Sequence, residues 1–142
     1  MAYLFDTDAI SEVLRPKPFV GYVRWLQTIP RGDQFASAVV VGELFRGAFR
    51  SPNAARHIQN IESRVLPALS VIPCDLDVAR VYGATQASLE NEGRVLADAN
   101  LQIAATALYH DLELVTGNLR HFSRIPGLRI CTALAQARAH QR

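Results

Sequence analysis

Asp6 is the first side chain whose position suggests chemistry. It directly follows the apolar run at residues 3–5, a pattern that predicts a short buried strand. In an open parallel sheet, ligands gather beyond the carboxyl ends of the strands, so an acid there is a candidate site residue. The alternative is that Asp6 or Asp8 simply caps the N-terminus of the following helix.

Glu43 gives a stronger signal. On a helix its neighbours at i−4, i−3 and i+4 would be Val39, Val40 and Gly47, so the carboxylate lies on an apolar or small-residue stripe. Burying an unpartnered carboxylate costs several kcal/mol. We therefore expect either Arg46, the only other charge nearby, or a bound cation to stabilise Glu43.

Further polar side chains occur at comparable places. Asn100 begins an otherwise apolar helical stripe, and Thr116 and Asn118 follow the expected strand at residues 112–115. Asp98 occupies a position typical of a helix N-cap. Polar residues from separate segments are thus expected to converge on one edge of the sheet.

A group of carboxylates without a lysine partner repels itself until a hard cation binds. Mg²⁺, with Mn²⁺ as an alternative, takes carboxylate oxygens and waters and leaves positions open for phosphate. The chemistry that fits is metal-assisted phosphodiester hydrolysis. The sequence contains no GxSxG, HExxH or P-loop motif, and its histidines show no metal-ligand pairing: His57, His110, His121 and His140.

The elements that must position these residues alternate along the chain. Strands alternating with helices are typical of a single α/β domain, with a parallel sheet flanked by helices on both faces. We expect this domain to span residues 1–131 and an Ala/Arg-rich tail with helical character to span residues 132–142. The expected strands lie at residues 3–5, 34–36, 69–72, 112–115 and 128–131.

Composition excludes several classes of protein. The 142 residues are 49% hydrophobic and 20% charged, which excludes general disorder, and no apolar run reaches the ~20 residues of a membrane span. Cys74 and Cys131 stand alone, which favours two small apolar residues at strand ends in a reducing cytoplasm. The net charge is only +2, and arginine accounts for every basic residue except Lys17. Arginine suits phosphate recognition, although genome base composition would produce the same bias.

The sequence resembles the PIN-domain ribonucleases of the VapC type, the toxin halves of bacterial toxin–antitoxin pairs. The resemblance runs from Tyr3 to about Cys131, and its four pieces occur in the family's order and spacing. They are residues 4–12 (LFDTDAISE), 41–44 (VGEL) with Gly47, 101–107 (LQIAATA), and 114–118 (LVTGN) followed by Phe122.

This resemblance implies a Mg²⁺-dependent endoribonuclease that leaves 5′-phosphate and 3′-hydroxyl ends. It makes Asp6 the first metal ligand and Glu43 the second acid. It also makes Asn118, where the family carries Asp or Asn, a group that positions water or phosphate, with Thr116 beside the substrate. A homodimer and a small antitoxin whose C-terminal segment covers the site are implied as well. Apolar helical faces support such partners, with aromatic and aliphatic residues at Phe19, Tyr22, Trp25, Leu26, Phe45 and Phe49.

One position departs from the family. Its third acid stands three residues before the Ile-Ala-Ala run, where this chain has Asn100. An amide keeps the shape of a carboxylate but loses its charge. We favour an inactivating Asp-to-Asn change made on purpose, over a naturally weakened member or a third acid supplied by Asp98. Two residues on a helix are separated by roughly 200°, so Asp98 would point away from the Asn100 stripe.

Two other functions compete with the nuclease. A catalytically inactive PIN module that binds RNA or protein would follow if Asn100 abolishes turnover. Residues 5–8 (FDTD) also resemble the nucleophile motif of haloacid-dehalogenase-type phosphatases, but Lys17 is the only lysine and no Asp-Asp pair occurs.

Overall fold

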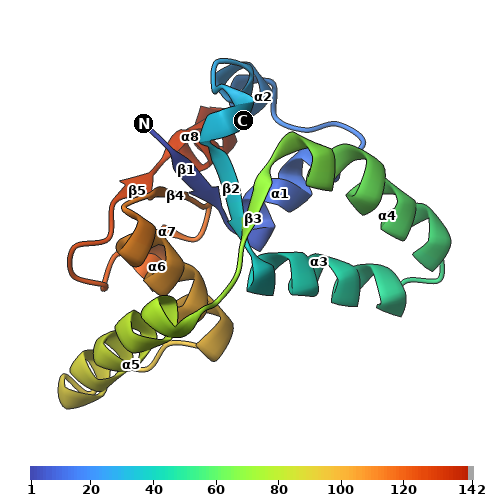
Figure 1. Ribbon diagram of the computed structural model, residues 1–142. Helices are drawn as coiled ribbons and strands as arrows, with labels where there is room; N and C mark the ends of the chain where they lie inside the picture. The colour runs from blue at the N-terminus through green and yellow to red at the C-terminus, as the bar shows by residue number, and fades with distance from the viewer. Residues whose placement is uncertain (141–142) are drawn as a thin grey trace.

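The computed structural model describes residues 1–140 and is built on a five-stranded sheet (Figure 1). The strand order is β3-β2-β1-β4-β5, and each pair of neighbours is parallel. The strands are β1 (Tyr3–Phe5), β2 (Gln34–Ser37), β3 (Ser70–Ile72), β4 (Glu113–Val115) and β5 (Ile130–Cys131). The predicted parallel α/β domain is therefore confirmed.

Strand β1 lies at the centre of the sheet and sets the register of its neighbours. Leu4 is opposite Phe35 of β2 and Leu114 of β4, and Phe5 is opposite Val115. Side chains of successive strand residues point to opposite faces, and both Leu4 and Phe5 are buried. Helices therefore cover both faces of the sheet, as expected.

The helices begin where the sequence offers suitable caps. Asp6, Ser37 and Asp75 each accept a hydrogen bond from a backbone N–H in the first turn of the helix that follows, which satisfies a donor that has no partner within the helix. The described helices are α1 (Thr7–Leu14), α2 (Val20–Gln27), α3 (Ala38–Arg50), α4 (Ala54–Asn60), α5 (Leu76–Asn91), α6 (Asp98–His110), α7 (Leu119–Phe122) and α8 (Ala133–His140), with the short turns η1 (Arg31–Asp33), η2 (Ile61–Val65) and η3 (Leu66–Ala68).

The expected N-cap at Asp98 is wrong. Ala97 is the N-cap of α6 and makes no side-chain cap bond, while Asp98 is the first helical residue. The Asp98 carboxylate instead accepts a hydrogen bond of 2.9 Å from the Tyr82 hydroxyl of α5. Helices α5 and α6 pack against each other, and the segment between them contains Gly93 with a φ of 70°. This packing brings the Tyr82 hydroxyl to Asp98.

The aromatic residues of α2 belong to the core. Tyr22 is fully buried, and its hydroxyl donates to the carbonyl of Ala9 at 2.9 Å. The Trp25 ring centroid lies 5.9 Å from that of Tyr22 and 5.3 Å from that of Tyr3. Trp25 itself is half-buried, and Val20 of α2 and Phe49 of α3 are strongly exposed.

The cysteines are both free. Cys131 ends β5, as expected, and is half-buried, whereas Cys74 is exposed and lies two residues beyond the end of β3. Within residues 1–140, no helix has the length and apolar character needed to cross a bilayer.

Candidate functional site

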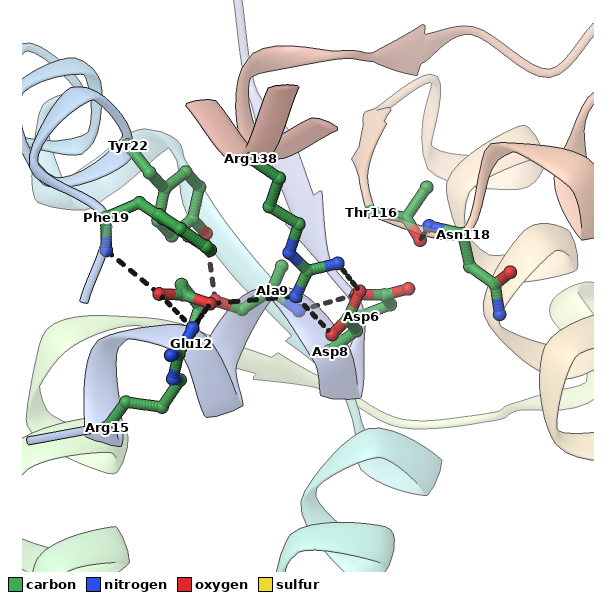
Figure 2. A network of polar contacts seen from close by, with 10 residues as sticks. All are labelled: Asp6, Asp8, Ala9, Glu12, Arg15, Phe19, Tyr22, Thr116, Asn118 and Arg138. Atoms are coloured by element: carbon green, nitrogen blue, oxygen red, sulfur yellow. Dashed lines mark hydrogen bonds and ion pairs between the residues drawn. The ribbon is translucent and has the colours of Figure 1, made fainter. Parts of the chain in front are cut away.

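The pairing of β1 with β4 brings two sequence-predicted site residues together. Phe5 lies opposite Val115, so Asp6 and Thr116 are the first residues beyond the carboxyl ends of adjacent strands. The backbone N–H of Asp6 donates to the carbonyl of Val115 at 3.1 Å. Figure 2 shows both side chains at this edge of the sheet.

Asp6 has a local structural role and an unusual environment at the same time. Its Oδ1 accepts from the Ala9 N–H at 2.8 Å and caps α1. The residue is only 5% exposed, and this burial raises the pKa of Asp6 to about 6, although hydrogen bonds from Thr116 and Ala9 oppose the rise. A buried carboxylate with a raised pKa at a strand end is a candidate for cation binding.

Glu43 reaches the same edge from α3. It is half-buried, and its Oε1 accepts a hydrogen bond of 2.5 Å from the hydroxyl of Thr7, the residue after Asp6. Arg46 is exposed, and no ion pair within the described residues joins it to Glu43. Of the two partners expected for Glu43, the arginine is therefore wrong, and a threonine hydroxyl that the sequence did not indicate is present.

Asn118 joins the group through β4. Its backbone N–H donates to Oγ1 of Thr116 at 2.9 Å, and its side chain is exposed at the start of α7. Thr116 is itself fully buried. The residues that end β1 and β4 thus converge as expected.

Asn100 is less closely connected. It lies half-buried in the first turn of α6, a helix that packs against α3. In the described part of the chain, no hydrogen bond or ion pair joins Asn100 to Asp6 or Glu43.

Near Asp6, Asp8 belongs to a charged network with Arg138 and Glu12, two residues to which the sequence reasoning gave no part in the site. Arg138 of α8 binds Asp8 with both ends of its guanidinium, at 2.9 Å from Nη1 and 2.7 Å from Nη2 (Figure 2). Its Nη2 also lies 3.6 Å from Oε1 of Glu12. Asp8 and Glu12 are one helical turn apart, where like charges repel, and that spacing was the available signal that a cation must lie nearby.

Glu12 is the most deeply buried acid of this network. It is 1% exposed, and its carboxylate accepts from Nη1 of Arg15 at 3.0 Å and from the backbone N–H of Phe19 at 3.0 Å. These partners, together with Arg138, satisfy a charge that would otherwise be costly to bury. Glu12 therefore ties α1 to the start of α2 and to α8.

A cleft of about 580 Å³ lies beside Glu43. Thr7 and Glu43 are among its lining residues. Its apolar floor includes Leu14, Leu44 and Ala48. Its polar lining includes Arg15, Asn53, Arg56, His57 and Asn60, so basic and amide groups outnumber acids along the cleft.

Comparison with known proteins places the chain in a family. The PIN domain model matches residues 3–128. The chain is 33% identical over 124 residues to Toxin FitB of Neisseria gonorrhoeae, covering 84% of this chain and 89% of that toxin. It is 34% identical over 124 residues to VapC ribonuclease Y4jK of Sinorhizobium fredii, with the same coverage of the two chains.

Solved structures agree with this placement. The FitAcB structure from Neisseria gonorrhoeae superimposes with a TM-score of 0.83 at 30% identity, covering 91% of this chain and 96% of that one. A chain of VapBC2 from Rickettsia felis, bound to a DNA fragment from their promoter, superimposes with a TM-score of 0.85 at 25% identity and covers 92% and 98%. This sets aside the phosphatase alternative, and the chain belongs to the PIN-domain family, among the VapC-type toxins.

Proposed function

We propose that this protein is an endoribonuclease toxin that hydrolyses RNA phosphodiester bonds with a divalent cation, Mg²⁺ or Mn²⁺. The observation that carries the proposal is the juxtaposition of the buried Asp6, with its raised pKa, and Glu43, hydrogen-bonded to the adjacent Thr7. Relatives named as VapC ribonucleases support the activity.

The donor groups fit a hard cation of this type. Mg²⁺ is commonly held by one or two carboxylates and several waters, and Asp6 and Glu43 would supply two carboxylates. Asn100 and Asn118 would add amide oxygens, which are neutral. Within residues 1–140, no three His, Cys, Asp or Glu side chains come together as ligands for one metal ion. We therefore expect weak binding of the cation as the chain stands.

Each residue has a distinct part in the proposed reaction. When bound, the cation would lower the pKa of a water and neutralise charge on the scissile phosphate. Asp6 and Glu43 hold their carboxylates at the strand end through their bonds to Ala9 and Thr7. Thr116 fixes the backbone of Asn118, whose exposed amide would orient the phosphate or the attacking water. Hydrolysis would break the P–O3′ bond, leaving a 5′-phosphate and a 3′-hydroxyl.

The cleft offers a path for the RNA. Its lining includes Glu43 together with Arg15, Arg56 and His57, which are suited to phosphate contacts, while the aliphatic floor is suited to a base. Single-stranded RNA is the form that presents both groups to such a surface.

The partners and location remain proposals for this chain. Neighbouring structures include toxin–antitoxin complexes, three of them bound to DNA, and we extend to this protein a small antitoxin partner. A homodimer would cover exposed apolar side chains such as Phe49, Val71 and Leu76. We also propose a cytoplasmic location and a PIN domain that ends near residue 131. Part of the expected tail, residues 141–142, lies outside the described residues.

The decisive test is Asn100→Asp. We expect this variant to cleave single-stranded RNA in Mg²⁺ or Mn²⁺ at a rate orders of magnitude above that of the parent, because it restores the charge missing from the proposed site. Gel analysis of a labelled RNA, with EDTA as a control, measures the rate.

Asp98→Asn in the restored background is the matched control. Asp98 accepts its hydrogen bond from Tyr82, so we expect cleavage to remain. If Asp98→Asn removes activity, the third acid is Asp98. If Asn100→Asp cleaves no RNA with either metal, the inactive RNA- or protein-binding module becomes the better interpretation.

A further inference from the structure

We infer that Arg138 is a positioning residue that withholds Asp8 from the proposed metal site, so that the C-terminal helix α8 limits how tightly the site binds a cation. The inference rests on the proposed function, because it assumes a cation beside Asp6. It assigns a role to a helix that lies beyond residue 128, where the match to the PIN domain model ends.

The first supporting observation is the geometry of the pair. Both oxygens of Asp8 are engaged, by Nη1 at 2.9 Å and by Nη2 at 2.7 Å. A two-point contact of this kind fixes the direction of the carboxylate as well as its charge. Figure 2 shows Asp8 next to Asp6 and beneath the guanidinium of Arg138. Asp8 is thus a third carboxylate near the site whose lone pairs face the arginine.

The second observation is that α8 is anchored in place. Leu134 and Ala137 are buried in the hydrophobic core, and α8 packs against α2. The neighbouring Arg138 therefore starts from a fixed backbone, and its guanidinium lies within reach of Glu12 as well as Asp8. The packing of α8 therefore keeps the Arg138 guanidinium beside Asp8.

The third observation concerns Gly117, between the site residues Thr116 and Asn118. A Cβ at position 117 would collide with Nη1 of Arg138 and with Oδ2 of Asp8. The absence of a side chain there makes room for the ion pair. A Gly117→Ala substitution would be accommodated most easily by displacement of the flexible end of Arg138.

The Arg138–Asp8 ion pair changes the charge around the proposed cation site. Arg138 places a positive charge near Asp6 and neutralises the negative charge of Asp8, and both effects oppose cation binding. Asn100, in the first turn of α6, is a neutral amide and adds no negative charge to the proposed site. Asp8 is the carboxylate closest in sequence to Asp6 that could add negative charge to the site. Its ion pair with Arg138 cancels that charge and keeps both oxygens away from the cation.

Mn²⁺ binding tests this without RNA or activity. Electron paramagnetic resonance of free Mn²⁺ gives the dissociation constant for the full-length protein. We expect Arg138→Gln to bind Mn²⁺ at least about threefold more tightly than the parent, since two charges several ångströms away both change in favour of the cation. Gly117→Ala should tighten binding in the same direction with no change in formal charge.

A cycle of variants separates this role from simple packing. Asp8→Asn leaves Arg138 with Glu12 as its remaining acidic partner and should weaken Mn²⁺ binding by about threefold, whereas the Asp8→Asn, Arg138→Gln double variant should return to within about twofold of the parent. Arg138→Lys keeps the charge and should stay close to the parent.

The matched control is Arg129→Gln. Arg129 also pairs with an aspartate, through a single carboxylate contact of 2.9 Å to Asp111, but Asp111 precedes β4, at the opposite end of that strand from Thr116. Loss of the Arg129–Asp111 pair in Arg129→Gln should leave Mn²⁺ affinity unchanged. Arg138→Gln protein that is folded by circular dichroism yet binds Mn²⁺ no more tightly than the parent, or not at all, overturns the inference. Failure of Asn100→Asp to cleave RNA would instead refute the nuclease proposal.

Discussion

The hydroxyl of Thr7 and the carboxylate of Glu43 are joined by a 2.5 Å hydrogen bond between residues 36 positions apart. This bond links the start of α1 to α3 and fixes one of the two proposed metal-holding carboxylates relative to the other.

Removal of the hydroxyl should loosen this link. We expect Thr7→Val to lower the free energy of unfolding by about 1 kcal/mol, because a half-buried carboxylate loses a donor. Thr7→Ser keeps the hydroxyl and should cost less. Urea denaturation of the metal-free proteins measures both, and equal losses for the two variants would show that the methyl group matters more than the bond.

Glu43 itself should be dispensable for folding. In the absence of metal, Glu43→Gln should leave the melting temperature unchanged or raise it, because glutamine retains an oxygen that can accept from Thr7 and removes a charge. Thermal melts with and without Mg²⁺ check this. A metal-free variant that melts well below the parent would make Glu43 a structural residue.

Asp6 should make the stability of the metal-free protein depend on pH. Its pKa is about 6 in the folded protein and about 3.9 in an unfolded chain. Between these values the folded state binds the proton more strongly, so stability falls as the pH rises from about 4 to about 6 and stays low above it. The loss is on the order of 2–3 kcal/mol.

Asp6→Asn should abolish this fall while keeping an N-cap. We expect it to stabilise the metal-free protein at pH 7.5 but not at pH 4, as followed by urea denaturation at each pH. Asp75→Asn is the control, since Asp75 caps α5 in the same way but is exposed. A parallel pH dependence in parent and Asp6→Asn would assign the effect to another group.

Glu12 should be essential for stability. Glu12→Ala would leave the Phe19 N–H without its acceptor and Arg138 without one of its acidic partners, and we expect a loss of about 3 kcal/mol. Glu12→Gln keeps one acceptor oxygen and should cost less. Denaturant unfolding compares them, and a loss under about 1 kcal/mol for Glu12→Ala would show that solvent replaces these bonds.

The basic lining of the cleft predicts that it contacts RNA phosphates. Without metal, Arg56→Ala should weaken binding of single-stranded RNA and reduce the salt dependence by about 0.7 in slope for each lost phosphate contact. Fluorescence anisotropy at several salt concentrations measures it. Arg80→Ala on α5 removes the same charge outside the cleft and should have little effect; equal losses would indicate nonspecific attraction.

The sequence by itself determined the strand pattern, an acidic cap at the start of α1, and the placement of Asp6 and Thr116 at strand ends. These features are local: hydrophobic periodicity sets the strands and helices, side-chain oxygens at helix starts set the caps, and parallel pairing then brings strand ends together.

The tertiary structure alone decided which partners the charged residues have. Glu43 accepts a hydrogen bond from Thr7 rather than pairing with the nearby Arg46. Asp98 accepts a hydrogen bond from Tyr82 rather than capping its own helix. Asp8 forms an ion pair with Arg138, which is 130 residues away in the sequence. Ion pairs and side-chain hydrogen bonds depend on distances of a few ångströms between segments, and sequence spacing does not encode those distances. Long-range packing of α8 onto α2 therefore placed Arg138 where no local pattern predicted it.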